Sequence, residues 1–185
     1  MRDVLDSLVS WWDGGKSTAL ATVVATFRSA PRQPGASMLV GTGGEAVGSV
    51  SGGCVEGAVY ELGNQVLGDG RSVLQRYGVS DDDAFAVGLT CGGILDVFVE
   101  KIDQETFPQL REVAEAIKAE DPVAVATVVA GPTERIGKRL VIWPDRVEGN
   151  TGSARLDDAL RDDARGLLDA GRNAMLHYGV DGQRR

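Results

Sequence analysis

Hydrophobic positions along this chain switch between the period of a strand and the period of a helix. An apolar, β-branched run over residues 18–27 predicts a strand that is buried on both faces. From about residue 53 to 67, apolar residues return every three or four positions and predict a helix that ends at Gly68-Asp69-Gly70. Further helices are expected at 3–13, 106–119 and 156–168, and further strands at 37–40, 45–50, 72–77, 94–102, 122–129, 139–143 and 174–178. This alternation predicts an α/β fold with helices on a layered, mixed sheet.

A repeat lies inside this pattern. Residues 21–25, Ala-Thr-Val-Val-Ala, recur 105 positions later, and Gly70-Arg71 recurs 101 positions later at Gly171-Arg172. The predicted elements between these anchors follow the same order in both copies. We therefore expect an internal duplication of a strand-loop-hairpin-helix-strand unit, with halves at 18–79 and 122–180, inside one domain spanning 1–185. In the second copy, the loop after the first strand is expected to be four residues shorter.

The composition is typical of a globular protein and argues against some classes of function. Of 185 residues, 43% are hydrophobic and 25% are charged, as in globular domains, and the formal net charge is −8. This acidic balance argues against nucleic-acid binding, which needs clustered Lys and Arg. No apolar run is long enough to span a membrane, and the first residues lack a signal-peptide pattern. We therefore expect a cytoplasmic protein whose thiols are reduced.

Both cysteines lie beside a Gly-Gly pair. The sequence Ser51-Gly52-Gly53-Cys54 opens the predicted helix together with Glu56, and Thr90-Cys91-Gly92-Gly93 precedes a predicted strand. Glycines let a ligand approach the backbone closely, and the first turn of a helix has unpaired N–H groups that suit a phosphate. A thiol at the same place adds a soft ligand, while Glu56 could accept a proton or complement the helix dipole.

Several interpretations of the two cysteines stay open at this point. Each could be a small buried side chain in a tight turn, or the two could bind one soft centre such as molybdenum, copper or a cluster. They could also carry sulfur as persulfides or form a regulatory disulfide. The repeat favours a function for Cys54, because the second copy has Gly152-Ser153-Ala154-Arg155 at the corresponding place and no thiol.

A loop with two arginines follows the first predicted strand. This loop contains Arg28 and Arg32 together with Pro31, Gln33 and Pro34. Loops at strand ends are common ligand sites in α/β folds, and two guanidinium groups could pair with one phosphate. The alternative is ordinary surface charge.

Three stretches in combination resemble the XdhC/CoxI family of accessory proteins for xanthine dehydrogenase and carbon monoxide dehydrogenase. They are residues 29–38, residues 48–56 and residues 88–93, in that order and spacing. The resemblance covers the whole chain as the N-terminal part of the family. Many members continue into a C-terminal Rossmann domain, which we expect to be absent here.

The resemblance implies a role in maturation of the molybdenum cofactor (molybdopterin). It implies that the protein binds this cofactor, supports its sulfuration and delivers it to a xanthine dehydrogenase-type hydroxylase. Cys54 and Cys91 become candidate contacts to molybdenum or carriers of sulfur. The candidate cofactor-binding residues are Arg28, Arg32, Gln33, Ser51, Gly52, Gly53, Cys54, Glu56, Thr90, Cys91 and Gly92.

The partners implied are that hydroxylase and a cysteine desulfurase, and a homodimer is expected by analogy with dimeric hydroxylases. We expect a maturation chaperone more than a turnover enzyme. The alternatives are a thiolate-dependent sulfurtransferase that acts on the cofactor, and a non-catalytic scaffold between the hydroxylase and a sulfur donor.

Overall fold

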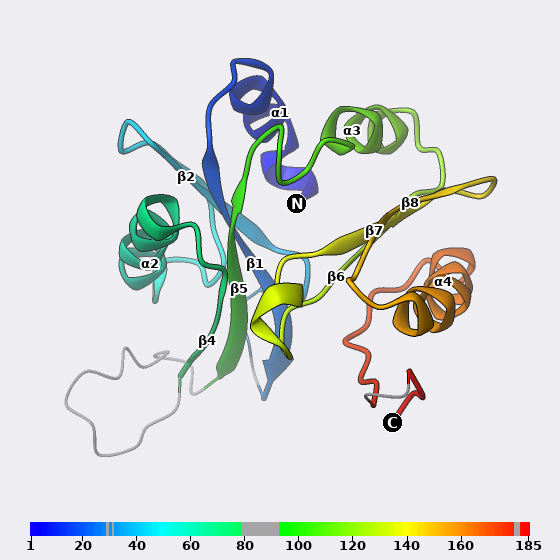
Figure 1. Ribbon diagram of the computed structural model, residues 1–185. Coiled ribbons are helices and arrows are strands. Elements are labelled where there is room, and N and C mark those ends of the chain that lie inside the picture. The colour runs from blue at the N-terminus through cyan, green and yellow to red at the C-terminus, as the bar shows by residue number, and fades with distance from the viewer. Residues whose placement is uncertain (29, 31, 79–92, 180–181) are drawn as a thin grey trace. The chain divides into compact units, whose positions relative to one another are not determined.

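The computed structural model describes residues 1–28, 30, 32–78, 93–179 and 182–185. It divides into two compact units, Met1–Pro108 and Gln109–Arg185, each with helices and one sheet (Figure 1). The fold is therefore mixed α/β, as the sequence predicted. The expected mixed sheet is corrected, because every strand pairing among the described residues is antiparallel.

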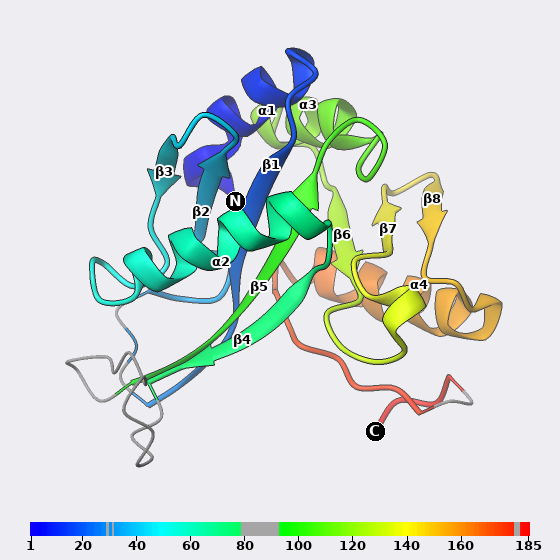
Figure 2. The ribbon, with the colours of Figure 1, turned by 60° about the vertical axis from the view of Figure 1, so that its left-hand side comes forward.

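The first unit is built on a five-stranded sheet in the order β3-β2-β1-β5-β4. Its elements are η1 (Arg2–Val4), α1 (Leu5–Asp13), β1 (Thr18–Phe27), β2 (Ser37–Gly41), β3 (Ala46–Gly48), α2 (Glu56–Asp69), β4 (Val73–Tyr77) and β5 (Ile94–Ile102). Helix α2 carries the chain from β3 at one edge to β4 at the other (Figure 2). The two strands that this helix joins are not neighbours, which is why no parallel pair forms in this sheet.

Helix α2 packs across one face of this sheet and makes the core of the first unit. Its buried positions Val59, Gly63 and Val66 follow the three-to-four spacing seen in the sequence. At Gly63 a Cβ atom would lie 2.8 Å from a methyl group of Val40 on β2. Glycine at this position therefore lets the helix approach the sheet closely.

The second unit is smaller and has a three-stranded sheet in the order β6-β7-β8. Its elements are α3 (Leu110–Lys118), β6 (Ala124–Thr127), η2 (Thr133–Arg135), β7 (Arg139–Ile142), β8 (Val147–Asn150) and α4 (Ala154–Asp169). Leu140 and Ile142 of β7 pack against Leu160 and Ala164 of α4 in its core. The helix thus covers one face of the sheet, as α2 does in the first unit.

The strand predicted at 174–178 is wrong. Only a single bridge between Tyr178 and Arg184 forms there, and the Tyr178 hydroxyl donates to Asp163 on α4 at 2.6 Å. In the first unit the corresponding segment is β4, which pairs with β5. The described part of the second unit has no strand in the position of β5, so this segment lacks the neighbour that would make it a strand.

The two units repeat one local hydrogen-bond arrangement. Val23 on β1 donates its N–H to Ala36 at 2.9 Å and accepts from Gly35 at 2.8 Å. In the second unit Val128 donates to Lys138 at 2.9 Å and accepts from Gly137 at 2.8 Å. Val128 lies 105 positions after Val23, but Gly137 lies only 102 positions after Gly35. The loop in the second unit is therefore three residues shorter, and the expected four is corrected.

A pair of equivalent glycines shows where the second unit is shorter by one further residue. Gly48 at the end of β3 and Gly149 in β8 have φ angles of 88° and 86°. A Cβ atom would meet the backbone oxygen of Ser37 in the first case and that of Arg139 in the second, both at 2.4 Å. Gly149 lies 101 positions after Gly48, so the second hairpin is one residue shorter than the first.

Candidate functional site

The sheet of the first unit brings two of the sequence motifs toward one end. Strand β1 ends at Phe27 opposite Ile94, the first residue of β5, and β2 begins at Ser37. The arginine loop (residues 28–36, described except for 29 and 31) and the cysteine loop (residues 49–55) therefore lie toward the end of the sheet where β5 begins. Thr90, Cys91 and Gly92 of the second cysteine motif lie outside the described residues.

The carboxylate of Glu56 organises the cysteine loop. It accepts hydrogen bonds from the hydroxyls of Ser49 and Ser51 at 2.6 and 2.5 Å. It also accepts from the backbone N–H groups of Val50, Ser51 and Gly53 at 3.1, 2.8 and 2.8 Å. Five donors on one carboxylate fix the loop against the first turn of α2.

The two serine hydroxyls accept hydrogen bonds from the rest of the loop. Ser49 Oγ accepts from the N–H of Gly52 at 2.9 Å. Ser51 Oγ accepts from the N–H groups of Cys54 and Val55, both at 3.0 Å. Together with the bonds to the carboxylate, this accounts for every backbone N–H from residue 50 to 55. The amides that the sequence offered to a phosphate are thus already bonded to the side chains of Ser49, Ser51 and Glu56.

These contacts also set the ionisation of Glu56. Partial burial by itself would raise the pKa of this carboxyl group. Hydrogen bonds from Ser49 and Ser51 outweigh that effect and lower the pKa from its ordinary value of 4.5 to about 2. Glu56 is therefore an anion near neutral pH. An anion with so low a pKa is better suited to accept hydrogen bonds from the loop than to take up a proton in a reaction.

Cys54 is the fourth residue of the segment Ser51-Gly52-Gly53-Cys54 in this loop. Its thiol is half-buried, and its side chain packs at the margin of the core cluster that contains Val50 and Val55. Gly52 and Gly53 beside it are exposed, with φ angles of 77° and 114°. A Cβ atom at either glycine would meet nothing within 4 Å, so the surface beside the cysteine is open.

The two arginines of the arginine loop differ in their ion pairing among the described residues. Arg32 is paired with Asp3, with 2.7 Å between Nη2 and Oδ2. Arg28 is exposed, has no ion pair among the described residues, and adopts a left-handed conformation with φ 63°. That conformation costs energy for a residue with a side chain and is frequent at functional positions. Gln33 is exposed, and its carbonyl accepts from the N–H of Ala36 at 3.1 Å.

A further ion pair near this end of the sheet was not predicted from the sequence. Arg76 on β4 makes two hydrogen bonds to Asp96 on β5, at 2.6 and 2.8 Å, and lies 5.0 Å over the ring of Phe27. These residues are 20 or more positions apart in sequence. Only the pairing of Arg76 opposite Asp96 brings them together, so the sequence held no local signal for this group.

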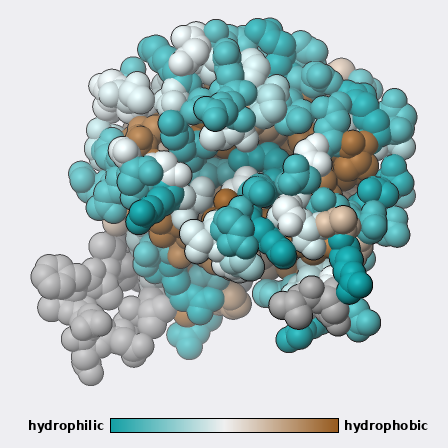
Figure 3. Space-filling model, viewed as in Figure 1, coloured by the Kyte–Doolittle hydropathy of each residue, from teal (hydrophilic) through white to brown (hydrophobic). Residues whose placement is uncertain are grey.

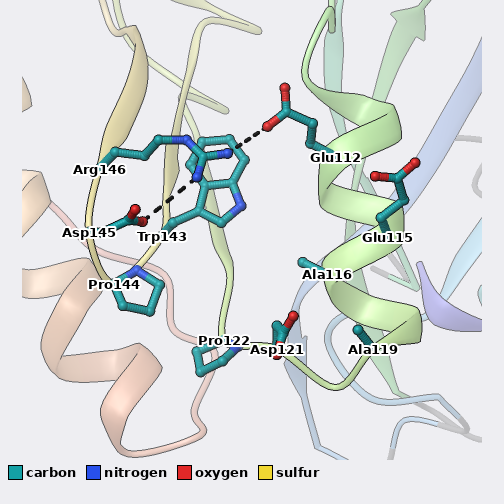
Figure 4. Close-up of a pocket in the computed structure, with 10 residues that line it drawn as sticks. All are labelled: Glu112, Glu115, Ala116, Ala119, Asp121, Pro122, Trp143, Pro144, Asp145 and Arg146. Atoms are coloured by element: carbon teal, nitrogen blue, oxygen red, sulfur yellow. Dashed lines mark hydrogen bonds and ion pairs between the residues drawn. The ribbon is translucent and has the colours of Figure 1, made fainter.

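The second unit contains a hollow of about 460 Å³ (Figure 4). Trp143 is buried at its side, with the guanidinium of Arg146 at 3.9 Å from the ring centre. Arg146 pairs with Glu112 on α3 at 2.5 Å and with Glu148 at 3.1 Å. The other lining residues are Glu115, Ala116, Ala119, Asp121, Pro122, Pro144 and Asp145. None of the predicted site residues lies in this hollow.

Metal-binding clusters and membrane spans are both absent from the part of the chain that the structure describes. No group of three or more His, Cys, Asp or Glu side chains among those residues could hold a metal ion. No helix in that part of the chain is both long and apolar enough to cross a bilayer. Large hydrophobic side chains that are exposed there are Phe27 and Leu74, and hydrophilic residues cover most of the face seen in Figure 3.

The fold and the cysteine loop define an α/β protein that presents one thiol where a loop enters a helix. Residues 11–78 and 116–179 match the XdhC and CoxI family, which is more than half of the chain. The chain therefore belongs to the XdhC and CoxI family. The matched segments include the cysteine loop and most of the second unit.

Two curated relatives and one solved structure are similar to the chain. It is 38% identical over 108 residues to a probable xanthine dehydrogenase subunit of Bacillus subtilis, covering 55% of this chain and 31% of that protein. It is 35% identical over 102 residues to the molybdenum cofactor insertion chaperone PaoD of Escherichia coli, covering 55% and 30%. The matched segment thus spans less than a third of the length of either relative.

The solved structure is a xanthine dehydrogenase from Bacillus halodurans. The TM-score is 0.65 and the identity 23%, and the match covers 83% of this chain and 45% of that one. This likeness shows a shared fold.

Proposed function

We propose that this protein binds the molybdenum cofactor at the cysteine loop and holds it for delivery to a xanthine dehydrogenase-type hydroxylase. The observation that carries the proposal is Cys54, a half-buried thiol on a loop that Glu56 fixes and that has open space beside it. Membership of the XdhC and CoxI family and the similarity to a cofactor insertion chaperone support it.

The residues present fit this cofactor in part. The cofactor joins a phosphate to a molybdenum centre, which supplies the redox chemistry of the hydroxylase once delivered. A thiol is a soft ligand that suits such a metal, and Cys54 supplies one. The exposed guanidinium of Arg28 suits the phosphate, whereas the loop amides do not, since each is already hydrogen-bonded. Arg32, Gln33 and the second cysteine motif remain candidates from the family resemblance.

Cofactor retention tests this proposal directly. The protein is loaded with molybdenum cofactor, passed through a desalting column, and assayed for bound molybdenum and pterin. We expect the wild-type chain to retain about one equivalent and Cys54→Ala to retain at least about tenfold less, because even the loss of an outer-shell partner of a metal ligand typically costs that much affinity. Arg155→Ala, at the corresponding place of the second unit, is the matched control and should retain the wild-type amount. Equal retention by Cys54→Ala and the wild type would remove Cys54 from the site.

Support of sulfuration is the finer part of the proposal. A half-buried thiol beside open space could also accept sulfur from the persulfide of a cysteine desulfurase. The desulfurase thiolate would leave, and a persulfide would remain on this chain. Intact-mass measurement after incubation with a desulfurase and cysteine separates the alternatives. An added sulfur atom on Cys54 or Cys91 indicates a sulfurtransferase, and an unchanged mass favours a chaperone.

Delivery is tested with apo-hydroxylase. We expect loaded wild-type protein to activate it and the variant lacking both thiols to fail. Activation by the variant without thiols, at the wild-type level, would instead indicate a scaffold.

A further inference from the structure

The two units share an acidic side chain that holds the loop before their helix. In the second unit, Asp157 in the first turn of α4 accepts from the N–H and the hydroxyl of Thr151 at 2.8 and 2.6 Å. Thr151 is fully buried, like Val50, which lies 101 positions earlier and donates to Glu56. A carboxylate that ties the preceding loop to the helix is therefore part of the plan common to both units.

The two carboxylates differ in how much of the loop they hold. Asp157 accepts from one residue, Thr151. Glu56 accepts from four residues, and its contact with Gly53 lies immediately before Cys54. Ser51, which donates to Glu56, also accepts from the N–H of Cys54 itself. The added contacts in the first unit are thus concentrated around the cysteine.

We propose that Glu56 is a positioning residue for Cys54 and does not contact the ligand. Its carboxylate takes the place that a bound anion would occupy among the loop amides. The loop then meets a ligand through the Cys54 thiol and not through backbone N–H groups. The ligand's part in this proposal rests on the function proposed above, whereas the positioning of the thiol can be tested without any cofactor.

A role in fold stability alone makes a different prediction from a positioning role. If Glu56 only stabilises the chain, replacing it should expose Cys54 no more than an equally destabilising change elsewhere. If it positions Cys54, replacing it should release the thiol locally, under conditions where the chain stays folded. Asp157 provides the matched control, because it makes the same kind of contact in a unit without a cysteine.

The experiment is native-state alkylation of the full chain with iodoacetamide, followed by mass spectrometry of the peptide that carries Cys54. We expect Glu56→Gln to raise the alkylation rate of Cys54 at least about tenfold, as expected for the loss of several loop hydrogen bonds. Asp157→Asn should leave that rate within about twofold of the wild type. Equal rates in all three proteins, or an equal rise in both variants, would overturn the proposal.

A second pair keeps the test decisive if Glu56→Gln does not fold. Ser49→Ala removes one donor to Glu56 and the acceptor for Gly52. Asn150→Ala removes the acceptor for Gly152, which is 3.0 Å from Asn150 Oδ1 in the second unit. We expect faster alkylation of Cys54 in the first variant only. If cofactor retention fails in the wild type while these rates differ as expected, the proposed ligand is wrong and the positioning role stands.

Discussion

Ser51 donates both its hydroxyl and its backbone N–H to the carboxylate of Glu56, at 2.5 and 2.8 Å. Ser51 is 1% exposed, and Val55 at the start of α2 provides no side-chain cap. The carboxylate of a residue in the first turn of α2 therefore holds the loop that precedes the helix. It also joins the end of the β2-β3 hairpin to the helix that covers the sheet.

The first prediction concerns the stability of this arrangement. Glu56→Gln should lower the free energy of unfolding near pH 7 by about 2 kcal/mol, because buried donors lose a charged acceptor. Urea unfolding followed by circular dichroism measures this. Glu61→Gln, on an exposed position of the same helix, is the control and should change stability by less than about 0.5 kcal/mol. A similar loss in both variants would contradict the prediction.

The same contact gives a pH dependence with a defined sign. The pKa of Glu56 is about 2 in the folded chain, below its ordinary 4.5. A lowered pKa in the folded state adds stability that is complete above the ordinary value and is lost as pH falls from 4.5 toward 2. The difference in unfolding free energy between wild type and Glu56→Gln should therefore shrink between about pH 5 and pH 3. A difference that stays constant over this interval would show that the carboxylate charge is unimportant.

The paired glycines give a prediction about the plan common to both units. Gly48→Ala and Gly149→Ala should each destabilise by about 2–4 kcal/mol, since both positions combine positive φ with a backbone oxygen 2.4 Å from the new Cβ. Gly57→Ala in α2 should instead stabilise by about 0.5–1 kcal/mol, because its Cβ meets nothing within 4 Å. Thermal unfolding distinguishes the three. Tolerance of alanine at position 48 or 149 would contradict the geometry described.

The ion pair between Arg76 and Asp96 should contribute more to the free energy of unfolding than an ordinary surface pair does. The Asp96 side chain is 13% exposed, so Arg76→Ala leaves a nearly buried carboxylate without its guanidinium partner and should destabilise the chain more than the loss of an exposed pair does. Arg161 pairs with Asp158 at 3.3 Å, with side chains 41% and 73% exposed. Arg161→Ala should therefore cost less than about 0.5 kcal/mol. Chemical denaturation of the two variants at low and moderate salt checks this ranking.

Arg28 should show opposite effects on stability and on binding. Because its φ is 63°, Arg28→Gly should stabilise the chain by about 1 kcal/mol while lowering cofactor retention. Glu120, with φ 59° in the second unit, is the matched control. Glu120→Gly should also stabilise but leave retention unchanged. If Arg28→Gly retains as much cofactor as the wild type, Arg28 is not part of the site.

Local pattern was enough to place most of the elements. The β-branched run at 18–27 and the apolar run at 94–102 became β1 and β5 with the predicted bounds. The spacing of Val59 and Val66 placed the buried side of α2. These features depend on neighbours within a few residues, and the periods of strand and helix are fixed by backbone geometry. The Gly-Gly-Cys motif likewise identified the loop and its thiol, since glycine and cysteine chemistry are properties of the residues themselves.

Contacts between distant residues required the folded chain. The segment at 174–178 has a strand-like sequence, but no strand in the described part of the chain lies beside it to pair with, so the lack of pairing overrode propensity. The partners of Arg32 and Arg76 depend on which residues the sheet and its loops bring within reach, and no spacing in the sequence encodes that. The sequence by itself determined that a thiol and a carboxylate stand at the entrance to α2. Only the tertiary structure decided that this carboxylate accepts hydrogen bonds from the N–H groups of the preceding loop. Hydrogen bonds are short and directional, and the folded backbone sets where the donors point.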